Sequence, residues 1–110
     1  MLIASRSLNY RSRTGDVPVP VTIYAPEKSD DGWICRFAIG WPDGAVERWG
    51  AGNDAVQSIV IAMQMIGAEI YASDYHKSGG LSWLAPGRGY GFPVTNNIRD
   101  LLIGDDARFF

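Results

Sequence analysis

The feature that most constrains this chain is a long apolar stretch, Ser58 to Ala72, entered through Gly50-Ala51-Gly52-Asn53-Asp54-Ala55-Val56-Gln57. Asp54 and Gln57 have the spacing of a capping box, in which the carboxylate accepts from first-turn amides and the glutamine reaches back toward the N-cap amide. Asn53 is the competing cap, one residue earlier. The pattern predicts one long helix that begins at Asp54 and runs to about Ala72.

Apolar residues surround most of this helix. The side expected to face the core repeats at three- and four-residue steps and comprises Val56, Ile59, Val60, Met63, Ile66, Gly67 and Ile70. The opposite side comprises Ser58, Ile61, Ala62, Met65, Ala68, Glu69 and Ala72. A surface helix normally has a charged outer face, so we expect a cover over Ile61, Met65 and Ala68. The cover is either the C-terminal third of the chain or a second subunit or partner protein, for which these three residues would be the interface.

Length and charge fit a single domain spanning residues 1–110. The net charge of -2 and a pI of about 5.2 disfavour nucleic acid as a partner. Cys35 is the single cysteine, which excludes an internal disulfide and a cysteine-based metal cage and fits a reducing compartment. The opening Met1–Ala4 is too short for a signal peptide. We expect no membrane span, because the helix carries Gln64, Gly67 and Glu69, and therefore a cytoplasmic location.

Four strands are predicted before the helix, at residues 2–11, 17–24, 33–41 and from 45 to about 50. The first alternates imperfectly, because Arg6 falls among its apolar positions. The second contains Pro18 and Pro20, which cannot donate to a ladder, so its early part is expected at an edge. The third is the strongest, with one apolar face made of Trp33, Cys35, Phe37, Ile39 and Trp41.

Pro42-Asp43-Gly44 joins the third and fourth strands as a hairpin turn. Type I geometry with a left-handed Gly44 would make a three-residue loop and pair Phe37 with Trp49. A two-residue Asp43-Gly44 loop would shift the register by one and turn Arg48 toward the face of Phe37. We favour the three-residue loop, because it keeps Arg48 off that face.

This order predicts an α+β domain, an antiparallel four-stranded meander packed on one long helix. Residues 74–80 are expected to form a loop, followed by a short fifth strand at Leu81–Leu84 and a glycine-rich segment at Ala85–Pro93. A short second helix would run from Asn97 to Ile103, with Gly104 as its stop. Residues 105–110 would form a tail.

The Trp33-Ile34-Cys35 strand, the Gly50 to Gln57 helix entry and the Gly91-Phe92-Pro93 element together resemble a family of small bacterial proteins of unknown function. The likeness spans roughly Leu8 to Pro93. It implies a bacterial cytoplasmic protein with four strands and a helix. It implies no activity, and no functional residue is carried over from it.

No residues form a recognisable catalytic constellation. His76 is the only histidine and falls in a polar loop, where a solvated role is the common one. Cys35 lies on an apolar face with no basic neighbour, which favours an inert thiol. No carboxylates have the spacing of a calcium loop, so no metal and no cofactor is predicted.

The run Gly87-Arg88-Gly89-Tyr90-Gly91 invites comparison with a phosphate loop, but Phe92-Pro93-Val94 separates it from any helix. We therefore favour a loop that crosses the back of the long helix. Arg88 and Tyr90 remain candidate binding residues for a ligand at that loop.

The open face of the sheet is the other candidate binding surface. In the favoured register Arg36 and Arg48 lie on it, and Tyr24 joins them from the second strand. Arginines beside an aromatic residue suit an anion, a single-stranded nucleic acid or an acidic protein surface. The alternative is an ordinary solvated sheet face with salt bridges.

The sequence thus favours a non-enzymatic domain that acts through protein contacts, as a homo-oligomer or within a small bacterial complex. The alternative function is a binder of small anions or single-stranded nucleic acid that uses the open face of the sheet. An enzyme that uses His76 with the glycine-rich loop is a third hypothesis, and it requires a cleft that holds His76 near Arg88.

Overall fold

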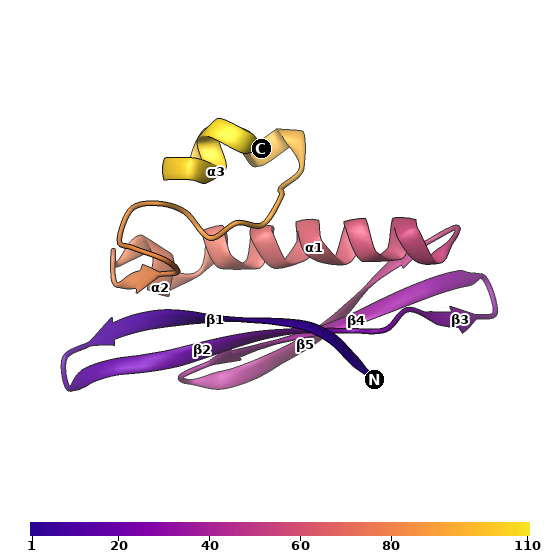
Figure 1. Ribbon diagram of the computed structural model, residues 1–110, viewed down its shortest axis with the longest axis horizontal. Helices are drawn as coiled ribbons and strands as arrows, with labels where there is room; N and C mark the ends of the chain where they lie inside the picture. Colours follow the sequence, from indigo (N-terminus) through magenta and orange to yellow (C-terminus); the bar gives the residue numbers. More distant parts are fainter.

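The computed structural model describes all 110 residues, as a sheet with one long helix across it and short helical turns above that helix (Figure 1). Its strands are β1 (Leu2–Ser12), β2 (Gly15–Tyr24), β3 (Glu27–Ser29), β4 (Gly32–Trp41), β5 (Gly44–Gly52) and β6 (Leu81–Ser82). Its helices are α1 (Ala55–Ala72), α2 (Asp74–Lys77), the 3-10 helix η1 (Asn96–Leu101) and α3 (Gly104–Phe109). The predicted α+β class, an antiparallel sheet packed on one long helix, is confirmed.

The four long strands form the predicted meander, in the spatial order β1-β2-β4-β5. Two short strands complete the sheet. β6, the predicted short fifth strand, pairs with Asn9 and Tyr10 of β1, and β3, which was not predicted, pairs with the start of β4. β4 pairs with β2 only from Val21 to Ile23. Pro18 and Pro20 therefore need no donor on that side, as their predicted edge position requires.

The hairpin between β4 and β5 is tighter than predicted. Trp41 pairs with Gly44, which leaves Pro42-Asp43 as the loop, and Phe37 pairs with Arg48. The predicted three-residue loop is therefore wrong, and every side chain of β5 points to the face opposite the predicted one.

The observed register turns mostly small residues of β5 toward the helix. Gly50 lies opposite Cys35 on that side, and Val46 lies opposite Ile39. Arg48 is the exception, since it lies opposite Phe37 and reaches Glu69 of α1. Trp49 moves to the open face.

Glycines on the inner side of β5 set how α1 lies on the sheet. A Cβ atom at Gly50 would lie 2.9 Å from Ala62 Cα, and one at Gly52 would lie 2.9 Å from Gln57 Cβ. The backbone of α1 therefore approaches β5 closely, with Ser58 and Ala62 fully buried between them.

The predicted core stripe of α1 is correct only in part. Ile66 and Ile70 are buried, but Val56 and Val60 are 68% and 46% exposed. Ser58 and Ala62, predicted on the back, face the sheet. A helix that is apolar on nearly every side carries little periodic signal for its own rotation, so the glycines of β5 decide it.

The capping box at the start of α1 is confirmed. Gln57 N donates to Asp54 Oδ1 at 2.8 Å, and Asn53 N donates to Gln57 Oε1 at 2.6 Å. Asp54 is the N-cap, so the Gln57 side chain accepts from the amide of Asn53, the residue before the cap. The helix runs from Ala55 to Ala72, close to the predicted bounds.

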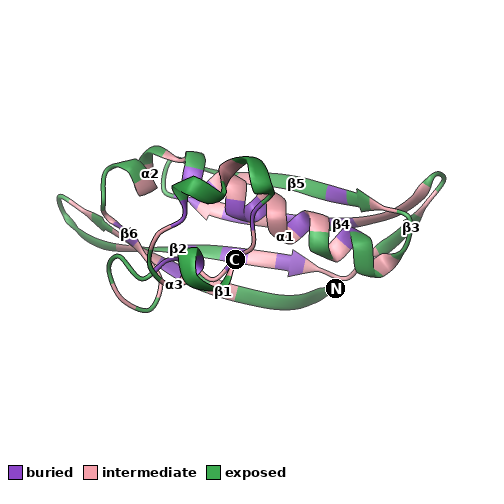
Figure 2. Ribbon diagram, turned by 90° about the horizontal axis from the view of Figure 1, so that it is seen from above, coloured by how far each residue is buried: buried purple, intermediate pink, exposed green.

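The C-terminal third crosses α1, and η1 and α3 lie on the side of α1 away from the sheet (Figure 1). Gly67 marks the crossing point, because a Cβ atom there would lie 2.9 Å from Val94 Cγ1. Viewed from above, the crossing segment covers the C-terminal half of α1 and leaves its first turns open (Figure 2).

Short helices replace two segments that were predicted without structure. Residues 74–77 form α2 where a loop was expected, and residues 104–109 form α3 where a tail was expected. The predicted short helix at 97–103 is η1, a 3-10 helix at 96–101. Gly104 opens α3 instead of ending the preceding helix, since its left-handed φ of +55° turns the chain.

The length and composition of α1, 18 residues with a mean hydropathy of 1.4, reach those of a membrane span, contrary to the sequence argument. Core helices of soluble proteins pass the same test. Here α1 packs on β4 and β5, and its single charge, Glu69, pairs with Arg48 at 2.8 Å. Packing on the sheet therefore accounts for part of its apolar surface.

Replacing Gly50 by alanine is expected to lower the free energy of unfolding by about 2 kcal/mol, because the added methyl group meets the backbone of Ala62. Urea unfolding measures the change. Ala51→Val, on the open face of the same strand, is the control and should change stability by less than about 0.5 kcal/mol. Equal losses of stability in the two variants would show that the close approach of α1 to β5 does not contribute to the free energy of unfolding.

Candidate functional site

The open face of the sheet carries a cavity beside Arg36. The register turns the Arg48 side chain to the helix side, where it pairs with Glu69, so its predicted facing onto the open side is wrong. Arg36 stays on the open face and pairs with Glu27 at 3.5 Å. The cavity has a volume of about 340 Å³ and is lined by Met1, Tyr24, Glu27, Arg36, Phe37, Glu47, Arg48 and Trp49. Its two glutamates offset the positive charge of Arg36, so the face has little attraction for an anion.

Arg88 and Tyr90, the candidate binding residues of the glycine-rich segment, lie in different surroundings. Arg88 is exposed and pairs with Asp105 at 2.8 Å. Tyr90 is 2% exposed and belongs to the core. The cavity beside Arg88 does not include His76, so the cleft that the enzyme hypothesis requires is not formed there. The glycine-rich segment crosses the helix, as predicted.

The predicted interface residues are half-buried on the flank of α1. Ile61, Met65 and Ala68 are each partly exposed, and Met65 packs against the core. The apolar residues that α1 leaves exposed are Val56 and Val60. The most exposed apolar residues of α1 are therefore not those of the predicted interface.

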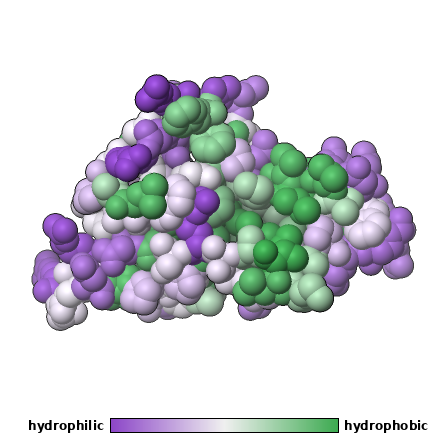
Figure 3. All heavy atoms as spheres, in the orientation of Figure 1, coloured by the Kyte–Doolittle hydropathy of each residue, from purple (hydrophilic) through white to green (hydrophobic).

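An apolar groove lies between the start of β1 and the N-terminal half of α1, and we call it the β1/α1 groove. It has a volume of about 190 Å³ and is lined by Ile3, Ala4, Ser5, Arg6, Val21, Ile23, Ile59, Met63 and Phe92. Hydrophobic residues gather over this part of the molecule (Figure 3). The exposed Val56 and Val60 extend the apolar surface along α1, since they are close to Ile59 and Met63 on the helix.

A buried polar cluster joins the C-terminal segment to the rest of the domain. Asp106 is 1% exposed, and its carboxylate accepts hydrogen bonds from Tyr71 Oη at 2.5 Å, Tyr90 N at 2.8 Å and Gly91 N at 2.8 Å. Tyr71 Oη also accepts from Ile103 N at 3.3 Å. A buried carboxylate is tolerated only where such donors replace water, so these contacts fix α3 in place.

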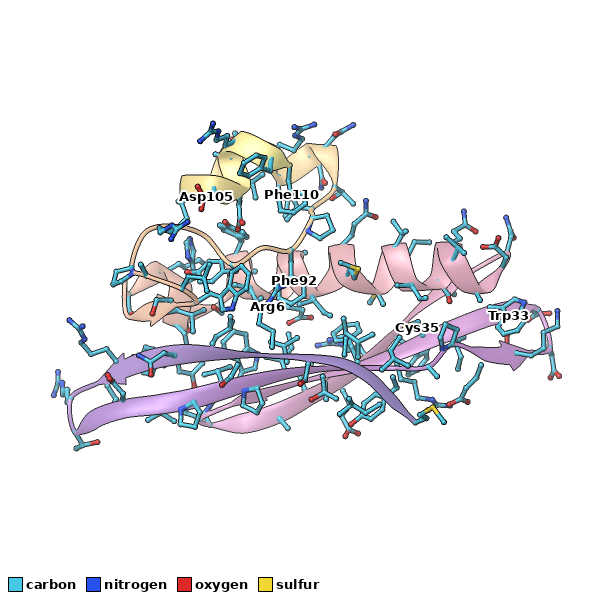
Figure 4. The ribbon with its side chains drawn as sticks, in the orientation of Figure 1. Arg6, Trp33, Cys35, Phe92, Asp105 and Phe110 are labelled. Carbon is cyan, nitrogen blue, oxygen red and sulfur yellow. The ribbon has the colours of Figure 1, made fainter.

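Arg6 binds the same loop through its carbonyl groups. Its Nη1 donates to the carbonyl oxygens of Tyr90 at 2.9 Å and Gly91 at 3.0 Å. The guanidinium lies 3.8 Å from the ring centroid of Trp83 and 4.6 Å from that of Phe92. Figure 4 shows Arg6 reaching from β1 toward Phe92 in the segment above the sheet.

The position of Arg6 explains the imperfect alternation of the first strand. Arg6 pairs with Val21, and Leu8 pairs with Val19, so both face the helix side of the sheet. Burial lowers the pKa of the Arg6 guanidinium, and the charge of Asp106 opposes that shift. A charged residue on an apolar face was the signal in the sequence for this contact. Asp106, in a predicted tail, gave no such signal.

His76 belongs to an aromatic cluster behind the same loop. Its Nδ1 lies 2.6 Å from Tyr90 Oη, and the same hydroxyl oxygen lies 3.3 Å from the carbonyl oxygen of Leu81. Burial lowers the pKa of His76, and Lys77 adds to the effect. Burial raises the pKa of Tyr90 to about 12, with a contribution from Asp106. The cluster therefore supplies neutral hydrogen-bonding groups near pH 7 and no strong base.

Cys35 is an inert thiol, as predicted. It is fully buried, and its Sγ donates to the carbonyl of Tyr24 at 3.4 Å. Burial raises the pKa of the thiol, which keeps it protonated.

Residues 4–94 match a family model. The chain belongs to the DUF6968 family, a domain of unknown function. The match confirms the resemblance to an uncharacterised family, over a range close to the predicted one. No curated protein and no solved structure matches the chain significantly. The matched range of this DUF6968 domain ends before η1 and α3, so Asp106 lies outside it.

Replacing Arg6 by methionine in this DUF6968 domain is expected to lower the free energy of unfolding by about 2 kcal/mol. Methionine keeps apolar contact with Trp83 but leaves two carbonyl groups without their donor. Urea unfolding measures the loss. Arg11→Met, at an exposed position of the same strand, is the control and should cost less than about 0.5 kcal/mol. A loss no larger than that of the control would contradict the assigned role.

The pH dependence of stability follows from the lowered pKa of His76. Below the ordinary value of 6.5 the unfolded chain binds a proton that the native state does not, so stability is complete above that pH and falls below it. The single histidine allows its ring to be followed by NMR, and we expect a titration midpoint below 6.5. His76→Asn should lose less stability than the wild type as the pH falls below 6.5. A midpoint at or above the ordinary value would show that the ring is not buried as described.

Proposed function

We propose that this DUF6968 domain is a non-enzymatic protein-interaction domain that pairs with a second copy of itself through the β1/α1 groove. The observation that carries the proposal is the groove itself, which is mostly apolar and lies between the start of β1 and the N-terminal half of α1. Ile3 at its rim is 46% exposed, as is Val60 beside it. Contiguous apolar surface of this kind marks interaction sites on folded proteins.

The free edge of β1 supports the proposal. β6 pairs only with Asn9 and Tyr10, so the outer edge of β1 from Leu2 to Leu8 has no partner strand. Unpaired strand edges add further strands readily, which gives main-chain hydrogen bonds next to the groove. The irregular pairing between Leu2 and Ala4 bends the start of the strand and limits such an edge contact to Ser5 through Leu8.

A second copy is the partner that suits both features. A two-fold arrangement brings one edge against the same edge and one groove against the same groove, so it covers both surfaces at once. Arg6 is the only charged residue that lines the groove, and its guanidinium is bound to Tyr90 and Gly91. Two copies can therefore pack groove to groove without bringing two unpaired arginine charges together.

The binding of small anions or single-stranded nucleic acid on the open face is the second candidate function. It is supported by Arg36, Tyr24 and the 57% exposed Trp49, which line one cavity. Glu27 and Glu47 line it too and weaken the attraction for phosphate. The β1/α1 groove is the better supported binding surface, because its mostly apolar lining can bind a partner by hydrophobic contact without an oppositely charged ligand.

The setting that we propose is a bacterial cytoplasm. Cys35 is the only cysteine and is buried as a free thiol, which fits a reducing compartment. The chain offers no second thiol for a disulfide.

Sedimentation velocity at micromolar concentration tests the proposed pairing. The wild type is expected to sediment as a dimer, and Ile3→Asp is expected to weaken the dimer at least about tenfold, or about 1.4 kcal/mol, because a carboxylate would be buried without a partner. Ile3 is half exposed in the monomer, so the variant should remain folded by circular dichroism.

Leu101→Asp is the matched control, since Leu101 is 52% exposed and lies in η1, outside the groove. It is expected to leave the dimer intact. A monomeric wild type, or equal effects of the two aspartate substitutions, would count against pairing through the groove.

A further inference from the structure

The carboxylate of Asp106 reaches its binding groups from outside the matched domain. The family match covers residues 4–94, which include the three donors to that carboxylate, Tyr71, Tyr90 and Gly91. Asp106 itself belongs to α3, beyond the match. The domain thus carries the binding groups, and the C-terminal segment supplies the group that they bind.

The donors are held in place by other residues of the domain. Arg6 binds the carbonyl oxygens of Tyr90 and Gly91, which orients the peptide groups of the loop. Left-handed φ angles of +93° at Gly89 and +76° at Gly91 turn neighbouring amides toward one point, as in the anion-binding nests of other proteins. Tyr71 is 3% exposed and packs edge-on against the ring of Tyr90, with 5.4 Å between ring centroids.

The site has the size of a carboxylate and borders a cavity. A Cβ atom at Gly89 would lie 2.6 Å from Asp106 Cγ, so the absence of a side chain there makes the space that the carboxylate fills. A cavity of about 290 Å³ borders Asp106, with aromatic walls from Trp83, Phe109 and Phe110. The cavity offers a small acid a route to the donors once the Asp106 side chain is removed.

From these contacts we infer that Tyr71, Tyr90 and Gly91 form a carboxylate-binding site of the domain, and that Asp106 is a built-in ligand which an external carboxylate can replace. Two main-chain amides and a phenol hydroxyl give the donor set that a carboxylate needs for its two oxygens. The Arg6 guanidinium, one peptide unit away, favours an anion over a neutral ligand. The inference does not depend on the proposed pairing through the β1/α1 groove.

The test is rescue of full-length Asp106→Ala by sodium acetate, with sodium chloride at the same ionic strength as the reference. Alanine leaves all three donors in place and empties the space of the carboxylate. Saturating acetate is expected to raise the midpoint of thermal unfolding of this variant by roughly 4 °C or more. It should also shift the amide resonances of Tyr90 and Gly91 in proton–nitrogen correlation spectra. If the variant is unfolded in chloride, the same titration is followed as recovery of near-ultraviolet circular dichroism.

Asp106→Leu is the matched control, because leucine fills the space with methyl groups and blocks the entry of acetate. Neither this variant nor the wild type should gain more from acetate than from chloride. An equal response of all three proteins, or no response and no recovery in the alanine variant, would overturn the inference and leave Asp106 as a structural residue alone.

Discussion

One peptide unit, between Tyr90 and Gly91, lies between a partly buried guanidinium and a buried carboxylate, and the arrangement of the C-terminal third depends on it. Its carbonyl oxygen accepts from the Arg6 guanidinium, and its N–H donates to the Asp106 carboxylate. The contact joins the first strand, the glycine-rich segment and the last helix, which are far apart in sequence. A buried charge that loses its partner is costly, so each of the two charged groups makes the other tolerable in the interior.

This contact also determines which part of α1 stays open. The crossing segment reaches the helix at Gly67 and is held from there to α3, so it shields the C-terminal half of α1. Val56 and Val60 stay exposed, and the adjoining start of β1 keeps a free edge. The two features leave one continuous apolar surface, the β1/α1 groove. The groove and the carboxylate site are thus separate consequences of where the C-terminal segment binds.

Local sequence signals predicted the local structure, and tertiary contacts decided the rest. The capping box, the order of the long strands and the edge position of the prolines follow from residue types a few positions apart. The rotation of α1 could not follow from its own pattern, because a helix that is apolar nearly all round fits a sheet in several ways. The glycines of β5 determine the rotation of α1. Which face of the sheet these glycines lie on depends on the hairpin register, and Pro42-Asp43-Gly44 was compatible with more than one register. For the buried cluster, Arg6 was visible as an exception to the strand pattern, whereas its link to Asp106 spans nearly the whole chain.

A double-mutant cycle on Arg6 and Asp106 tests whether the two side chains are coupled through the Tyr90–Gly91 peptide unit. The free energy of unfolding would be measured in urea for the wild type, Arg6→Met, Asp106→Asn and the double variant. The two side chains act through one peptide unit, so we expect the double variant to lose less stability than the sum of the single losses, by about 1 kcal/mol or more. Losses that add to within about 0.5 kcal/mol would show that the two groups act independently, and would contradict the account.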